Sequence, residues 1–145
     1  MRRWVLALMF LISIVPAVGQ AQAPALDVRE GDRAAIRAVI GDQIAAFRRD
    51  DAAAAYAFAS PSIQRQFAAP DIFLEMVRRG YAPVYRPQSV TFGDLVRVDT
   101  TLIQLVEIVG PDGVSVLAAY EMEQQSDGAW RINGCALLAI DRRQT

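Results

Sequence analysis

Hydrophobic positions recur at a helical spacing in the first half of the chain and at a strand spacing in the second half. After residue 30, apolar residues return every three or four positions, which predicts a helix with one buried face. These positions are Ile36, Val39, Ile40, Ile44 and Phe47. From Ser89 onward, β-branched residues and alternation predict strands instead. Helices therefore precede strands.

Shorter helices are predicted after the first, and capping residues or prolines mark where they begin. The predicted ranges are Ala52–Ala59, Ser62–Phe67 and Asp71–Arg79. Asp51 and Ser60 are typical N-cap residues, and Pro70 is typical of a first helical turn. The two prolines within Tyr81–Pro87 predict an extended segment.

Four strands are predicted, separated by short turns rich in Gly and Asp. Their ranges are Ser89–Val98, Thr101–Val109, Val114–Gln124 and Ala129–Ile140. Gly93 predicts a bulge in the first strand, and alternation in the last puts Trp130, Ile132, Leu138 and Ile140 on one face. Because short turns join antiparallel neighbours, the strands form a meander whose apolar face the helices must cover. The predicted fold class is α+β.

Residues 1–23 have the three parts of an export signal. Two arginines precede an apolar run of about 15 residues, which is shorter than the ~20 that span a bilayer. Small residues follow, and cleavage is expected after Ala21 or Ala23. Residues 24–145 are then expected to form a single α+β domain, periplasmic or secreted, with no stable membrane span after cleavage.

The amino-acid composition excludes several kinds of functional site. The 15 basic residues are all Arg, the 16 acidic residues give a formal net charge of −1, and there is no His. The absence of a concentrated basic surface argues against nucleic acid. The absence of His excludes His-based triads and His-ligated metals, and no cofactor or metal site is expected. The single cysteine, Cys135, is interpreted as a buried small residue.

Several segments together resemble a bacterial family of small exported proteins, the "domain of unknown function 4864" family. Its most specific segments here are Ala59-Ser60-Pro61 and Trp130-Arg131-Ile132-Asn133-Gly134-Cys135. The resemblance covers nearly all of residues 24–145. It implies a fold similar to the cystatin-like, nuclear-transport-factor-2-like superfold, in which N-terminal helices pack on a strongly bent four-stranded antiparallel sheet. It implies no activity.

Candidate catalytic residues follow from the cavity that such a fold often encloses. Glu107 interrupts an apolar strand and shares its parity with Ile103, Leu105 and Val109, which favours an inward orientation. With Tyr120 or Tyr56 it would form an acid/base pair, because an apolar pocket raises the pKa of a carboxyl. The alternative is a solvent-facing Glu107 or a cross-strand pair with Arg131.

Candidate ligand-binding residues are aromatic or polar side chains near the helix ends and the last strand. They are Tyr81, Tyr85, Arg86, Trp130 and Asn133. Each has a structural alternative: Arg86 near a helix end complements its charge, and Trp130 belongs to the core.

Three functions remain open at this stage. The preferred hypothesis is a non-catalytic domain that binds a small apolar or amphipathic ligand or a partner. One alternative is a His-independent acid/base enzyme of isomerase, dehydratase or cyclase type, and another is a structural envelope protein. Apolar residues on both faces of the second strand, such as Val106 and Leu105, also suggest a homodimer through the sheet.

Overall fold

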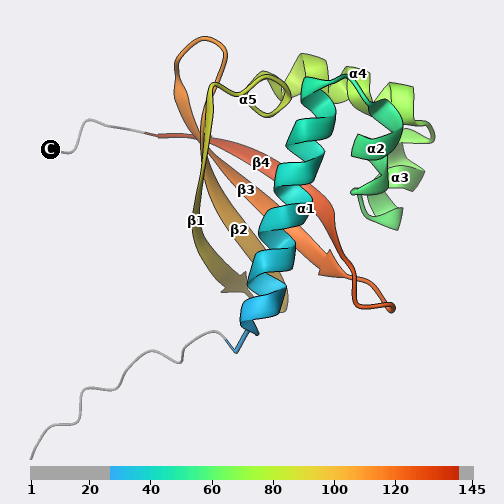
Figure 1. Ribbon diagram of the computed structural model, residues 1–145, viewed down its shortest axis with the longest axis vertical. Helices are drawn as coiled ribbons and strands as arrows, with labels where there is room; N and C mark the ends of the chain where they lie inside the picture. Colours follow the sequence, from blue (N-terminus) through green and yellow to red (C-terminus); the bar gives the residue numbers. More distant parts are fainter. Residues whose placement is uncertain (1–26, 141–145) are drawn as a thin grey trace, which may run out of the picture.

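Helices come first and strands second in the computed structural model, which describes residues 27–140 (Figure 1). The helices are α1 (Glu30–Arg48), α2 (Ala52–Ala57), α3 (Pro61–Phe67), α4 (Pro70–Gly80) and α5 (Ala82–Tyr85). The strands are β1 (Ser89–Val98), β2 (Thr101–Val109), β3 (Ser115–Gln124) and β4 (Trp130–Ala139). The predicted α+β class is confirmed. The expected extended segment at 81–87 is wrong, because one helical turn begins at Ala82, and Pro83 in its first turn does not block it.

The predicted apolar stripe of α1 packs on the sheet. Ile36, Ile40 and Phe47 are at most 1% exposed and form the centre of the core. The strands pair antiparallel in the order β1-β2-β3-β4, as expected for a meander. The helix-covered face of the sheet carries the even-numbered residues of β2 and β3, such as Val106 and Tyr120, which are buried.

Bulges in the two edge strands change which residues share a face. In β1, Gly93 and Asp94 lie opposite Leu105 alone, which confirms the predicted bulge. In β4 the register also shifts, between the pairs Met122–Ile132 and Glu121–Gly134. The prediction that Ile132 and Leu138 share a face is therefore wrong, because one extra residue reverses the alternation. Cys135 consequently joins Tyr120 on the helix-covered face.

The loop between α2 and α3 is bonded to the edge of β4. The Ser60 amide donates to the Ile132 carbonyl at 2.8 Å, and the Ile132 amide donates to the Phe58 carbonyl at 2.9 Å. The Ser60 hydroxyl donates to Asn133 Oδ1 at 2.7 Å and also accepts from the Ile63 amide, which confirms Ser60 as an N-cap. The helical layer is thus fixed to the strand that carries Cys135.

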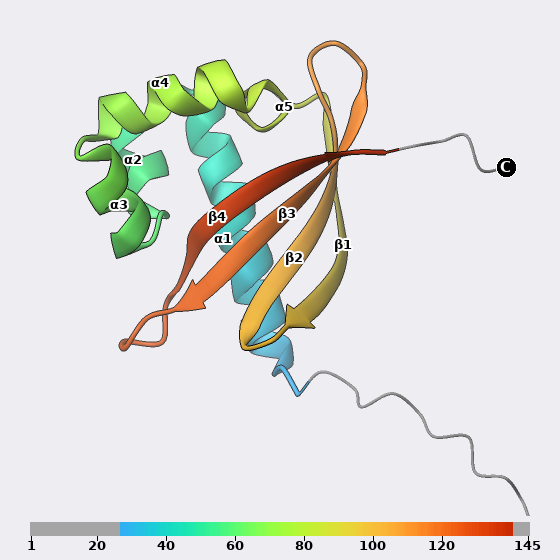
Figure 2. The ribbon, with the colours of Figure 1, turned by 180° about the vertical axis from the view of Figure 1, so that it is seen from behind.

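The opposite face of the sheet, here called the open face, is covered by none of the helices in the described part of the chain. In Figure 2 the strands lie in front of α1, and α2, α3 and α4 extend past β4. Ile103, Leu105 and Glu107 of β2 lie on this face, and Leu138 of β4 is 49% exposed there. Among residues 27–140, no helix is both long and apolar enough to cross a bilayer.

Candidate functional site

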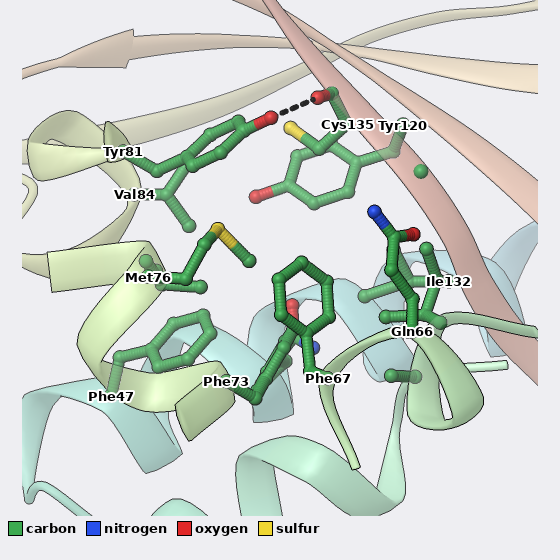
Figure 3. Close-up of a pocket in the computed structure, with 15 residues that line it drawn as sticks. Phe47, Gln66, Phe67, Phe73, Met76, Tyr81, Val84, Tyr120, Ile132 and Cys135 are labelled. Carbon is green, nitrogen blue, oxygen red and sulfur yellow. Dashed lines mark hydrogen bonds between the residues drawn. The ribbon is translucent and has the colours of Figure 1, made fainter. Parts of the chain in front are cut away.

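A cavity of about 220 Å³ lies between the helices and the covered face of the sheet. Its walls come from α1, the α2–α4 region, the α4–α5 junction, β3 and β4. The lining residues are Gln43, Phe47, Ala59, Ile63, Gln66, Phe67, Phe73, Met76, Val77, Tyr81, Val84, Tyr120, Ile132, Gly134 and Cys135 (Figure 3). The lining is predominantly apolar, and none of these side chains carries a formal charge at neutral pH.

Tyr120 provides a buried hydroxyl group at this cavity. Its side chain is 1% exposed, and its hydroxyl has no hydrogen-bond partner among residues 27–140. The hydroxyl points into the space bounded by Val84, Met76 and Phe67 (Figure 3). Burial raises the pKa of Tyr120 well above its ordinary value, so the phenol is neutral and retains its proton. A buried hydroxyl without a partner costs roughly 1–3 kcal/mol, which a bound acceptor or donor would offset.

Cys135 lies beside Tyr120, to which it is paired across β3 and β4. The phenol and the thiol affect each other's pKa, in part as a weak hydrogen-bonding pair, but their geometry falls outside the distance and angle limits of a hydrogen bond. Burial raises the pKa of the Cys135 thiol to about 12, and the Tyr120 hydroxyl opposes this in smaller measure. Tyr81 donates its own hydroxyl to the Cys135 carbonyl at 3.1 Å, so that hydroxyl already has an acceptor.

The entrance lies on the α3–α4 side. Tyr120 and Phe47 on the floor are fully buried, whereas Phe67 and Met76 are half-buried and Gln66 is exposed. Aromatic rings line the passage: Phe73 contacts Phe67 at 5.9 Å and Phe47 at 6.1 Å between ring centroids. A small molecule entering past Gln66 would therefore meet apolar surface before it reaches the Tyr120 hydroxyl.

Trp130 and Asn133 lie in a different hollow, a polar groove of about 490 Å³ between the start of α1 and the nearby ends of the strands. The Trp130 indole donates to Asp32 at 3.2 Å, and Asn133 donates to Glu121 at 3.1 Å. Hydrogen bonds from Arg29, the larger effect, and from Trp130 lower the pKa of the Asp32 carboxyl. These side chains are therefore engaged with one another.

Tyr85 and Arg86 hold the end of α1 and do not line the cavity. Arg86 donates to the Phe47 carbonyl in the last turn of α1 and to both carboxylate oxygens of Asp50, at 2.9 and 3.0 Å. Tyr85 also donates to Asp50, which lowers the pKa of that carboxyl. The structural alternative given for Arg86, charge complementation at a helix end, is the arrangement observed.

Glu107, Tyr56 and Tyr120 are not brought together. Glu107 is exposed on the open face, so its expected inward orientation is wrong. The buried positions of β2 are the even-numbered residues, and the apolar odd-numbered neighbours of Glu107 lie on the open face with it. Tyr56 donates to the Gln64 carbonyl at 2.7 Å within the helical layer and does not line the cavity. The pair proposed for acid/base chemistry is therefore absent.

Several lining residues were not singled out from the sequence. Phe47, Phe73 and Met76 were predicted only as parts of apolar helix faces, and Phe67 only as the end of a short helix. Gln43 interrupts the polar–apolar pattern of α1, yet it is 3% exposed and donates to the Ala55 carbonyl at 3.1 Å. A polar residue next to a predicted buried position was the one sign in the sequence that this part of α1 borders a site.

Within the described residues, no three His, Cys, Asp or Glu side chains converge in a way that would hold a metal ion. The cavity itself offers a phenol, a thiol, carboxamides and aromatic surface. This arrangement can bind an uncharged group by one or two hydrogen bonds, and it supplies no carboxylate base among the lining residues.

Comparisons with known proteins give one match. A family model described as "Domain of unknown function (DUF4864)" matches residues 29–145. No curated protein and no solved structure matches the chain. The two segments on which the resemblance depended most, around Ser60 and around Asn133, are the ones that hydrogen bonds join in space. Because the family model covers most of the sequence, the chain belongs to the DUF4864 family.

Proposed function

We propose that this protein is a non-catalytic binding domain that takes a small apolar or amphipathic molecule into the cavity beneath Tyr120. The observation that carries the proposal is the Tyr120 hydroxyl, which is 1% exposed, has no partner and points into an apolar hollow. Native proteins pair nearly all of their buried polar groups. A ligand that hydrogen-bonds this hydroxyl supplies the missing partner.

The size and the lining support the same proposal. A cavity of about 150 Å³ lined by apolar side chains accommodates benzene in another protein. The present cavity, at about 220 Å³, is somewhat larger and has aromatic walls. The enzyme alternative is less well supported, since Glu107 lies on the open face and no Asp or Glu is among the lining residues.

A methyl-resolved NMR titration with toluene tests the proposal. We expect shifts at the methyl groups of Met76, Val84 and Ile132, which line the cavity, and none at Val98 or Leu138 outside it. Met76→Trp fills the entrance and should abolish the shifts. Ile72→Trp is the matched control, because Ile72 lies on the same helix but is 56% exposed and outside the lining. Absence of cavity shifts with millimolar toluene and, in a second titration, with millimolar phenol would refute the proposal.

We also propose export to the periplasm or beyond and a homodimer formed through the open face. Export rests on the signal-like residues 1–23, which lie outside the described residues. The apolar side chains on the open face, with Val98 and Leu138 about half exposed, support the dimer. Sedimentation equilibrium of the protein and of Leu138→Glu tests it: a dimer that the substitution dissociates is expected, and a monomeric unmodified protein contradicts it.

A further inference from the structure

The cavity restricts not only whether a molecule binds but also which chemical class it accepts. This inference rests on the proposed function. The volume of about 220 Å³ lies below the ~300 Å³ at which pockets for drug-sized ligands begin and above that needed for benzene. A single six-membered ring with one or two substituents fills such a volume, whereas a fused multi-ring compound or a long acyl chain would extend out through the entrance.

The lining also selects against charge. No Asp, Glu or Arg is among the lining residues, and the carboxamide of Gln43 already donates to the Ala55 carbonyl. Arg86 and Asp50 lie at the end of α1, where they form an ion pair with each other. A carboxylate or ammonium group at the floor would lose its hydration without gaining a counter-charge, which is strongly unfavourable.

Aromatic rings and sulfur atoms dominate the contact surface. Phe47, Phe67 and Phe73 line one side, and Met76 and Cys135 contribute sulfur (Figure 3). Ring–ring contacts with edge-to-face or offset geometry and sulfur–ring contacts each favour an aromatic guest over a saturated one. The Phe73 ring already contacts those of Phe47 and Phe67 in tilted and edge-to-face arrangements that an additional ring would extend.

The hydrogen-bonding groups of the cavity are matched by a ligand that carries one oxygen atom. The Tyr120 hydroxyl can donate and accept, and it has no partner. The Tyr81 hydroxyl already donates to the Cys135 carbonyl. We propose that the cavity binds an uncharged, single-ring aromatic compound that presents one hydroxyl or carbonyl oxygen to Tyr120 Oη.

Isothermal titration of the protein with four small probes at neutral pH tests this class. The probes are phenol, toluene, benzoate and cyclohexanol. Phenol and toluene have nearly the same size, so their comparison isolates the oxygen; benzoate adds charge, and cyclohexanol removes aromaticity. We expect phenol to bind most tightly and benzoate at least ~10-fold more weakly than phenol, because its carboxylate is desolvated without a partner.

Two tyrosine variants show which hydroxyl forms the hydrogen bond to phenol. Tyr120→Phe should weaken phenol binding by roughly 3- to 10-fold, the effect of one neutral hydrogen bond, and change toluene binding less than ~2-fold. Tyr81→Phe is the matched control, since it removes a hydroxyl from the same cavity that already has an acceptor. It should leave the ratio of phenol to toluene affinity unchanged.

The outcomes separate the two proposals. If toluene binds but Tyr120→Phe leaves the phenol affinity unchanged, or if benzoate or cyclohexanol binds as tightly as phenol, the class is wrong and the proposed function stands. If neither toluene nor phenol binds, the proposed function fails and this inference fails with it.

Discussion

The two hollows of this protein differ in how their polar groups are satisfied. The groove around Trp130 and Asn133 is the larger, at about 490 Å³ against about 220 Å³ for the cavity beneath Tyr120. In the groove, the indole of Trp130 and the carboxamide of Asn133 bond to neighbouring side chains. In the cavity, the Tyr120 hydroxyl has no hydrogen-bond partner within the part of the chain that the structure describes and meets only the Cys135 thiol.

This difference identifies the better site more reliably than size does. A hollow whose polar groups bond to one another holds the surrounding segments together, as Ser60 and Asn133 join the helical layer to β4. In the cavity, the one unpartnered buried group stays unsatisfied until something binds it. We therefore interpret the groove as a structural joint and the cavity as the site.

Phe73→Ala should produce the largest effect, because the cavity wall is also the core. Phe73 is 5% exposed, and its ring contacts those of Phe47, Tyr56 and Phe67. We expect the free energy of unfolding to fall by about 3–5 kcal/mol in urea titrations. Trp130→Ala in the groove, where the side chain is half-buried, should cost less. An equal or greater loss of stability for Trp130→Ala would contradict the interpretation that the cavity wall, and not the groove, belongs to the core.

Ser60→Ala should lower the free energy of unfolding by about 1–3 kcal/mol, because Ser60 joins the helical layer to Asn133 of β4. The substitution removes the N-cap of α3 and leaves the Asn133 oxygen without its partner at 2.7 Å. Ser62→Ala, an exposed position in the same helix, should change the free energy of unfolding by less than about 0.5 kcal/mol. Equal effects of the two substitutions in urea titrations would show that the joint contributes nothing.

Alkaline pH should weaken the cavity floor through Cys135. Burial raises the pKa of its thiol from 9.0 to about 12, so the unfolded chain releases this proton at lower pH than the folded protein. This contribution to stability is intact below pH 9 and is lost as the pH rises toward 12. At pH 10 the loss of stability relative to pH 7.5 is about 1–2 kcal/mol. In urea titrations, Cys135→Ala should lose less stability between these two pH values than the unmodified protein does. Equal losses in the two proteins would contradict the burial of the thiol.

Tyr120→Phe should have the smallest effect on stability, and its sign is informative. Since the hydroxyl has no partner, its removal should leave the free energy of unfolding unchanged or raise it by less than about 1 kcal/mol. Tyr81→Phe should lower it by about 0.5–1.5 kcal/mol, because it breaks the bond to the Cys135 carbonyl. A marked loss for Tyr120→Phe would mean that its hydroxyl is bonded within the protein.

Periodicity was sufficient to predict the order of helices and strands, because local residue preferences and burial agree along most of this chain. The ranges of β1 and β2 were predicted to the residue. The bulge in β4 was missed, although Gly134 follows the extra residue Asn133 and is the same kind of cue that predicted the bulge at Gly93. That one shift turned Leu138 outward relative to Ile132 and brought Cys135 next to Tyr120.

The candidate site was less predictable for a related reason. Strand parity gives two faces but does not say which one the helices cover, and Glu107 was assigned to the wrong one. Tyr120 was identified, but its missing hydrogen bond depends on three-dimensional packing. Phe47, Phe67 and Met76 converge from three helices, which no pattern along the chain reveals. The finer resemblance to the cystatin-like superfold stays a prediction.

A crystal structure of the protein soaked with phenol tests the central claim most directly. We predict electron density for one ring between Phe67, Met76 and Val84, with the phenol oxygen within hydrogen-bond distance of Tyr120 Oη. An empty or collapsed cavity, with phenol bound only in the groove beside Trp130, would contradict the assignment of the cavity as the binding site.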